Sequence, residues 1–273
     1  MTTHPLAGQA AAAVTAQGTW IPAPGAAPLH RMIAAQAAQE TRQLLRNGEQ
    51  LMLTLIIPLL LLAAFSLEPL IDLGGGYTRI DFLTPGVIAL AVMSTAFTSQ
   101  AIATGFERRY GVLKRLGATP LSRPGLIAAK TATVIGVELL QAVIIGLVAL
   151  ALGWSPDASP AAIVVVPLLI LLGTAAFSGF ALLLAGTLRA EATLAAANLI
   201  YVVLLGIGGV VFPLTKFPRG ARPLLELLPT GALSTGLRSA LANADAFPAR
   251  DAVTLAVWAV IGVAAAARYF QWE

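Results

Sequence analysis

Residues 107–123 of this chain read ERRYGVLKRLGATPLSR and lie between two long apolar runs. The stretch concentrates positive charge in five residues: Arg108, Arg109, Lys114, Arg115 and Arg123. A cationic segment between two runs that can cross a membrane is typical of a cytoplasmic loop. The apolar runs on either side therefore decide the fold, and the loop itself is the first candidate for a contact surface.

The composition excludes an ordinary soluble domain. Of the 273 residues 58% are hydrophobic and 11% are charged, whereas a soluble domain carries about 25% charged residues. The mean hydropathy is +0.83, and we therefore expect an integral membrane protein. The absence of cysteine excludes disulfides and thiolate chemistry. A net charge of +4 favours basic loops facing an anionic lipid surface over nucleic-acid binding.

Six apolar runs are long enough to cross a bilayer. They predict an all-α polytopic membrane protein with spans at about residues 50–67, 82–105, 125–152, 161–187, 193–213 and 250–267. Residues 1–29 carry no charged side chain and are rich in Ala, Gly and Pro, so we expect a disordered tail followed by a transmembrane domain over 30–273. If both ends are cytoplasmic, eleven Lys and Arg residues lie inside and six outside, which favours that orientation.

Two segments outside the spans have helical patterns of their own. Residues 30–48 place apolar side chains near one face, which predicts an amphipathic helix on the membrane surface. The segment between the last two spans is interrupted by prolines. Leu233, Leu237 and Leu241 recur there at a spacing of four, which predicts a short amphipathic helix.

The opening stretch has a pattern beyond its charge. Phe106, Tyr110 and Leu113 fall on one helical face. Gly117 is a helix stop, Pro120 prevents continuation, and Ser122 can cap the next helix with Pro124 in its first turn. We interpret the stretch as a short surface helix, a turn and the start of the third span. The alternative is an ordinary positively charged loop.

These residues resemble the cytoplasmic loop of type-2 ABC exporter permeases, a family that includes daunorubicin-resistance-type drug exporters and polysaccharide exporters. The family reads Glu-Arg, then Gly-Thr-Leu, a leucine pair, and Thr-Pro-Leu-Ser-Arg. This chain departs from that pattern at Val112, where Thr is usual, and at Lys114, where an acidic residue is common. The matching positions are Glu107, Arg108, Gly111, Leu113, Leu116, Thr119, Pro120, Leu121, Ser122, Arg123 and Lys130. The order of elements also matches over nearly the whole chain.

The resemblance implies a role for each region. Residues 107–123 would be a coupling helix that docks on a separate ATPase subunit, with Tyr110 and Leu113 as apolar anchors, and 30–48 would flank the same contact. The short helices before the last span, with Gly208, Gly209 and Pro213, would form an outer gate. A second permease copy or a homologous permease would complete the pathway in a bacterial plasma membrane. The implied docking residues are Glu107, Arg108, Arg109, Tyr110, Leu113, Arg115, Thr119, Pro120 and Arg123.

The sequence holds no nucleotide site of its own. A phosphate-binding loop needs Gly-x4-Gly-Lys-Ser/Thr, and the single Lys-Thr pair, Lys130-Thr131, follows Ala129 instead of glycine. We expect Lys130 to snorkel to the inner membrane face. No cofactor and no catalytic set is expected on this chain, so ATP and magnesium would be bound by the partner subunit.

Polar residues within the spans are candidates for a substrate path. Glu138 lies near the middle of the third span and Gln141 shares its face. They predict a polar patch on the path or at a subunit interface, and the alternative is a protonated Glu138 bonded to a neighbouring helix. Asn198 in the fifth span is a similar case. These residues allow a hydrophobic or amphipathic cargo, such as a drug, a lipid or a glycan-like molecule, without selecting one.

Two other function classes stay open. A secondary transporter or channel needs no ATPase, but such proteins often have internal repeats and several charges within the membrane. This sequence has no clear repeat and one clear charge of that kind, Glu138. The third class is a membrane scaffold that transports nothing.

Overall fold

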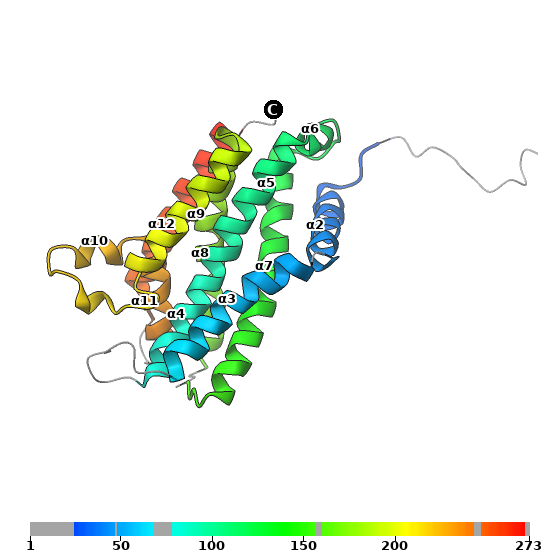
Figure 1. Ribbon diagram of the computed structural model, residues 1–273. Helices are drawn as coiled ribbons and strands as arrows, with labels where there is room; N and C mark the ends of the chain where they lie inside the picture. Colours follow the sequence, from blue (N-terminus) through cyan, green and yellow to red (C-terminus); the bar gives the residue numbers. More distant parts are fainter. Residues whose placement is uncertain (1–24, 47, 68–77, 157–159, 243–246, 271–273) are drawn as a thin grey trace, which may run out of the picture.

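The computed structural model describes residues 25–46, 48–67, 78–156, 160–242 and 247–270, and within these ranges the chain is helical without strands. Figure 1 shows long helices side by side, with α10 and α11 at one flank of the bundle. The predicted tail at 1–29 lies largely outside the described residues. The helices that bear on function are α2 (Leu29–Arg46), α3 (Gly48–Leu67), α4 (Arg79–Met93), α5 (Gln100–Arg109), α6 (Val112–Gly117), α7 (Arg123–Ala151), α8 (Ala162–Thr187), α9 (Ala190–Ile207), α10 (Arg222–Glu226), α11 (Pro229–Ala242) and α12 (Ala249–Tyr269).

The prediction of an all-α polytopic membrane protein is confirmed. Five helical segments are long and apolar enough to cross a membrane: Arg79–Arg109, Pro124–Ala151, Ala162–Thr187, Ala190–Ile207 and Ala249–Tyr269. In α3 the apolar part, Thr54–Ser66, is shorter, and six spans therefore stay a prediction. The fifth span was predicted to reach residue 213, but α9 ends at Ile207 because the chain turns at Gly208 and at Gly209, whose φ is +68°.

The second span is the central helix of the bundle. It runs without interruption through α4, a π-helical turn at Ser94–Ser99 (η1) and α5, over the 31 residues Arg79–Arg109. At 1.5 Å per residue such a helix is about 46 Å long, which exceeds the ~30 Å hydrocarbon core of a bilayer. Of its most apolar part, 89% is buried inside the protein. The chain therefore leaves the membrane as a continuation of its best-packed helix.

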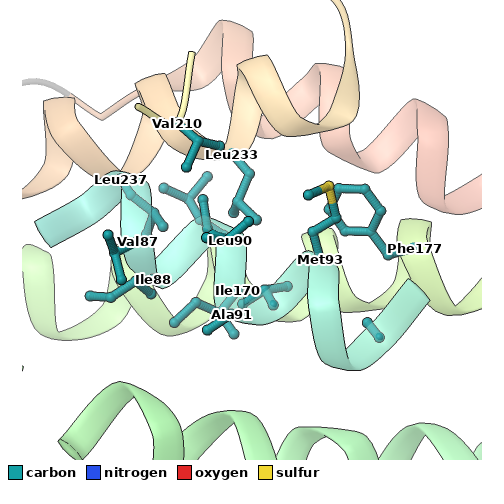
Figure 2. Close-up of a cluster of buried hydrophobic side chains, with 14 of the residues drawn as sticks. Val87, Ile88, Leu90, Ala91, Met93, Ile170, Phe177, Val210, Leu233 and Leu237 are labelled. Atoms are coloured by element: carbon teal, nitrogen blue, oxygen red, sulfur yellow. The ribbon is translucent and has the colours of Figure 1, made fainter. Parts of the chain in front are cut away.

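Apolar side chains pack this central helix against its neighbours. Figure 2 shows Leu90 and Met93 of α4 against Ile170 and Phe177 of α8, with Leu233 of α11 close by. Leu90, Met93 and Leu233 have no exposed surface. Lipid tails are as apolar as these side chains, so van der Waals packing holds the helices together here.

The last helix, α12, packs on α8 through paired glycines. A Cβ atom added at Gly179 would lie 2.4 Å from the carbonyl carbon of Gly262 and 2.6 Å from the amide nitrogen of Val263. Backbone atoms cannot move aside as a flexible side chain can. The two helices therefore approach as closely as they do because neither has a side chain at the crossing.

Gly179→Ala should destabilise the protein by about 1–3 kcal/mol, because the added methyl group forces α8 and α12 apart. The matched control is Gly146→Ala in α7, where an added Cβ meets nothing within 4 Å. Alanine favours a helix over glycine, so the control should melt at or above the wild-type temperature. Thermal unfolding of the two purified variants measures the difference, and equal melting temperatures would contradict the close crossing.

Candidate functional site

The stretch 107–123 folds as two helices joined by a sharp turn. Helix α5 ends at Arg109, Gly111 adopts a left-handed conformation with φ of +70°, and α6 begins at Val112. The helix stop at Gly117 is confirmed. The cap is also confirmed, because the Ser122 hydroxyl accepts a hydrogen bond of 3.3 Å from the Gly125 amide at the start of α7. The loop therefore has a defined shape rather than only a charge.

The break at Gly111 separates the two expected docking anchors. Leu113 has no exposed surface and packs in a small cluster with Leu121 and Phe270. The prediction that Leu113 contacts a partner is therefore wrong, because the left-handed turn rotates α6 and points this side chain into the protein. Its contact with Phe270, directly after α12, also places the loop beside the end of that helix.

Tyr110 lies on the outside of the same turn with 67% of its surface exposed. Its ring stacks on Phe106 with 6.1 Å between ring centroids, and the Arg109 guanidinium lies 5.9 Å from the ring centre. Arg115, Thr119 and Pro120 are also exposed. We call Tyr110, Val112, Arg115, Thr119 and Pro120 the exposed tip. The side chain of Arg123 lies outside the described residues.

Arg108 and Arg109 face the junction between α8 and α9. Arg108 Nη2 donates a hydrogen bond of 2.8 Å to the Leu188 carbonyl, and Arg109 forms an ion pair with Glu191. The side chains of that pair are 51% and 58% exposed, so it contributes at most about 1 kcal/mol. These two predicted docking residues therefore tie the loop to the start of α9 within the same chain.

Glu107 belongs to a buried ion network and not to the surface. Lys130 Nζ lies 2.7 Å from Glu107 Oε2 and 3.3 Å from Glu40 Oε1, and only 5% of the Lys130 side chain is exposed. The expected snorkelling of Lys130 is therefore wrong. Because a buried ammonium is costly unless it is paired, the two carboxylates fix Lys130 in place and join α2, α5 and α7. Sequence spacing gave no signal of this network, since its members lie far apart in the chain.

Glu138 and Gln141 lie within the helix bundle. Each is at most 3% exposed. Gln141 accepts a 2.9 Å hydrogen bond from Thr95 of η1, and its amide lies 3.4 Å from the Thr54 carbonyl of α3. Glu138 is hydrogen-bonded to Thr174 of α8. These contacts are those of the alternative interpretation, in which the polar groups join neighbouring helices.

Asn198 has a different environment. It lies on the exposed face of α9 among apolar side chains that include Leu199 and Val202, which are 67% and 62% exposed. None of the residues that the structure describes forms a hydrogen bond with its amide. An amide facing lipid is unfavourable, and polar side chains of this kind join helices in membranes.

The segment that follows α9 is held by Arg238. Its Nε donates to the Phe82 carbonyl of α4 and its Nη2 to the Val210 carbonyl, each at 3.0 Å, while the guanidinium lies 3.8 Å from the Phe82 ring centre. Ser234 donates 3.0 Å to the Gly208 carbonyl. The predicted gate residues Gly208 and Gly209 form the turn, and the buried Pro213 precedes a short 3-10 helix at Leu214–Lys216. From the sequence alone, Arg238 was only one of the six basic residues expected outside the membrane.

The family model of ABC-2 type transporters matches residues 33–242, more than three quarters of the 273-residue chain. The matched range includes the shaped loop, the buried ion network and the turn after α9. No individual curated protein matches the sequence significantly. The chain therefore belongs to the ABC-2 type transporter family, as a multi-pass membrane subunit that takes part in transport and is not itself catalytic.

Proposed function

We propose that the chain is the permease subunit of an ATP-driven exporter, which moves a hydrophobic or amphipathic substrate such as a drug, a lipid or a glycan-like molecule out of the cytoplasm. A separate ATPase subunit binds Mg-ATP, since the permease sequence has no phosphate-binding loop. The observation that carries the proposal is the exposed tip at the end of the 31-residue central helix.

The exposed tip has the features of a docking surface. Tyr110 offers a large amphipathic ring and Arg115 a guanidinium, which are the side-chain types that dominate binding energy at protein interfaces. Thr119 and Pro120 complete a turn that is braced by a 2.6 Å hydrogen bond from the Thr119 hydroxyl to the Leu116 carbonyl. A partner that displaces this tip moves α5, and through the continuous helix it moves α4 as well.

A second permease completes the pathway in this proposal. The face of α9 that carries Asn198 presents an amide among exposed Leu and Val side chains, and a matching helix would satisfy the amide and cover the apolar surface. A second copy of the chain and a homologous permease both fit. The complex lies in a bacterial plasma membrane with the docking loop and both termini on the cytoplasmic side.

Tyr110→Ala should abolish ATP-dependent transport and weaken ATPase binding by tenfold or more, in the range of an aromatic interface residue. Folding should be unchanged because the side chain is 67% exposed. The matched control is Tyr269→Ala at the end of α12, which is 56% exposed and also lies beside an arginine, Arg268, at 5.8 Å. The measurement is Mg-ATP hydrolysis retained on the tagged permease in mild detergent, together with transport in vesicles.

Three results would count against the proposal. If Tyr110→Ala retains both transport and bound ATPase activity, the tip is not the docking surface. If the wild type transports substrate without ATP and retains no ATPase, the alternative of a secondary transporter or channel is correct. Equal losses in Tyr110→Ala and Tyr269→Ala would show that neither aromatic residue acts specifically.

A further inference from the structure

A polar cavity of about 240 Å³ lies where α2, α5 and α7 meet. It sits beside the π-helical turn η1, and its wall includes the buried ion network. The polar side chains around it that bear on a ligand are Glu40, Glu107, Lys130, Gln100 and Thr104, and Gln43, Thr95, Ser99 and Thr133 also line it.

Two buried side chains at this cavity lack hydrogen-bond partners. Gln100 is 6% exposed. Its Oε1 accepts a hydrogen bond of 2.7 Å from the Ser178 hydroxyl of α8, and its Nε2 has no partner among the described residues. Thr104 is fully buried and its hydroxyl is also without a partner there. Nearly all buried polar groups in proteins are hydrogen-bonded to the protein or to water, so these two groups at the cavity wall are the ones that a ligand or a water molecule would satisfy.

The backbone explains why these two groups share one wall. The π-helical turn Ser94–Ser99 inserts an extra residue into the helix and shifts the face that follows. Gln100 and Thr104, four residues apart in α5, therefore lie one above the other, and both line the cavity. Such π turns occur often at functional sites.

The charged side chains around the cavity determine which ligand charge it favours. Lys130 supplies one positive charge, and Glu40 and Glu107 supply two negative charges, which leaves a net charge of −1 (+1 − 2). Because the ammonium of Lys130 is already paired with both carboxylates, a simple anion is disfavoured and a second cation is favoured. The unpaired amide and hydroxyl groups in addition offer hydrogen bonds to an oxygen of the ligand.

We propose that the polar cavity binds a primary ammonium group adjacent to a phosphate ester, which is the chemistry of ethanolamine phosphate. Glu40 and Glu107 accept from the ammonium, and Gln100 and Thr104 bond to the phosphate oxygens. A cavity of 240 Å³ is smaller than drug-sized sites, which are about 300–1,000 Å³, but it holds a headgroup. Such a group can come from phosphatidylethanolamine or from a free molecule, and the site does not depend on ATPase docking.

The test uses the intact permease in nanodiscs that contain phosphatidylethanolamine and phosphatidylcholine in equal amounts. Native mass spectrometry after release measures the lipid retained, and thermal shift with free phosphoethanolamine tests the soluble source. We expect about tenfold preferential retention of phosphatidylethanolamine, because a trimethylated ammonium cannot donate hydrogen bonds to the carboxylates. Protection by free phosphoethanolamine without lipid selectivity would support the same chemistry with a soluble source.

Gln100→Met and Thr104→Val keep the volume of each side chain and remove the unpaired polar group, so each should reduce the preference. Thr187→Val is the control, since that exposed hydroxyl bonds to its own helix at Leu183. If the wild type selects neither lipid nor phosphoethanolamine, the cavity holds only water and the proposal is wrong. If both variants keep the full wild-type preference, the ligand binds elsewhere and the proposal is also wrong.

Discussion

Lys130→Met should destabilise the permease by about 3–5 kcal/mol, the cost of removing one partner from a buried ion pair. Methionine keeps most of the unbranched side chain but leaves Glu40 and Glu107 without their cation, with side chains only 13% and 27% exposed. At about 2–4 °C per kcal/mol for a chain of this size, the melting temperature should fall on the order of 10 °C. Thermal unfolding in one detergent provides the measurement.

A second variant separates charge from packing. In Lys130→Met combined with Glu40→Gln and Glu107→Gln, no charge is left without a partner, and replacement of a whole buried ion network is often nearly neutral. We expect the triple variant to regain most of the lost stability. Arg115→Met, which removes an exposed cation at the tip, is the control and should melt like the wild type. A single Lys130→Met variant that also melts like the wild type would disprove the ion network.

The sequence was sufficient where neighbours along the chain decide the structure. Composition and the apolar runs determined the membrane class, because a helix in lipid satisfies its own backbone. The Ser122 cap and the Gly117 stop were also predictable, since a cap depends on a hydroxyl three residues before the amide that it bonds. Gly208 and Gly209, expected at an outer gate, form the turn that ends α9 before the predicted end of the fifth span at residue 213.

The sequence was insufficient where the partner is distant in the chain. Leu113 was expected at the surface because Leu121 and Phe270, which cover it, come together only in the folded chain. Lys130 looked like a snorkelling side chain because no sequence spacing pairs it with Glu40 on α2.

Two long-range side-chain interactions hold opposite ends of the central helix. Arg238 bonds to the Phe82 carbonyl in the first turn of α4, and Lys130 pairs with Glu107 in the last turn of α5. Since α4, η1 and α5 are continuous, a displacement at the exposed tip reaches the turn after α9 through a single element. The hydrogen bonds of Arg238 therefore connect the proposed gate to the central helix.

Arg238→Met should release that turn and destabilise the protein by about 3–6 kcal/mol, since a hydrogen bond from a charged group contributes about 1.5–3 kcal/mol and two are lost. It also removes the stacking on Phe82. Arg238→Lys should not rescue the loss, because an ammonium lacks the planar fork that reaches two carbonyls at once. Amide hydrogen exchange should rise at residues 208–214 in both variants.

Arg222→Met is the matched control. Arg222 also bonds to two backbone carbonyls, Phe217 and Thr215, but both belong to its own loop. Its loss should therefore raise exchange only within residues 214–228 and leave Gly208–Val210 protected. If Arg238→Met and Arg222→Met give the same exchange pattern, the turn is held by apolar packing of Leu233 and Val210, and Arg238 does not couple the gate to the central helix. If only Arg238→Met opens the turn, the guanidinium is the connection between them.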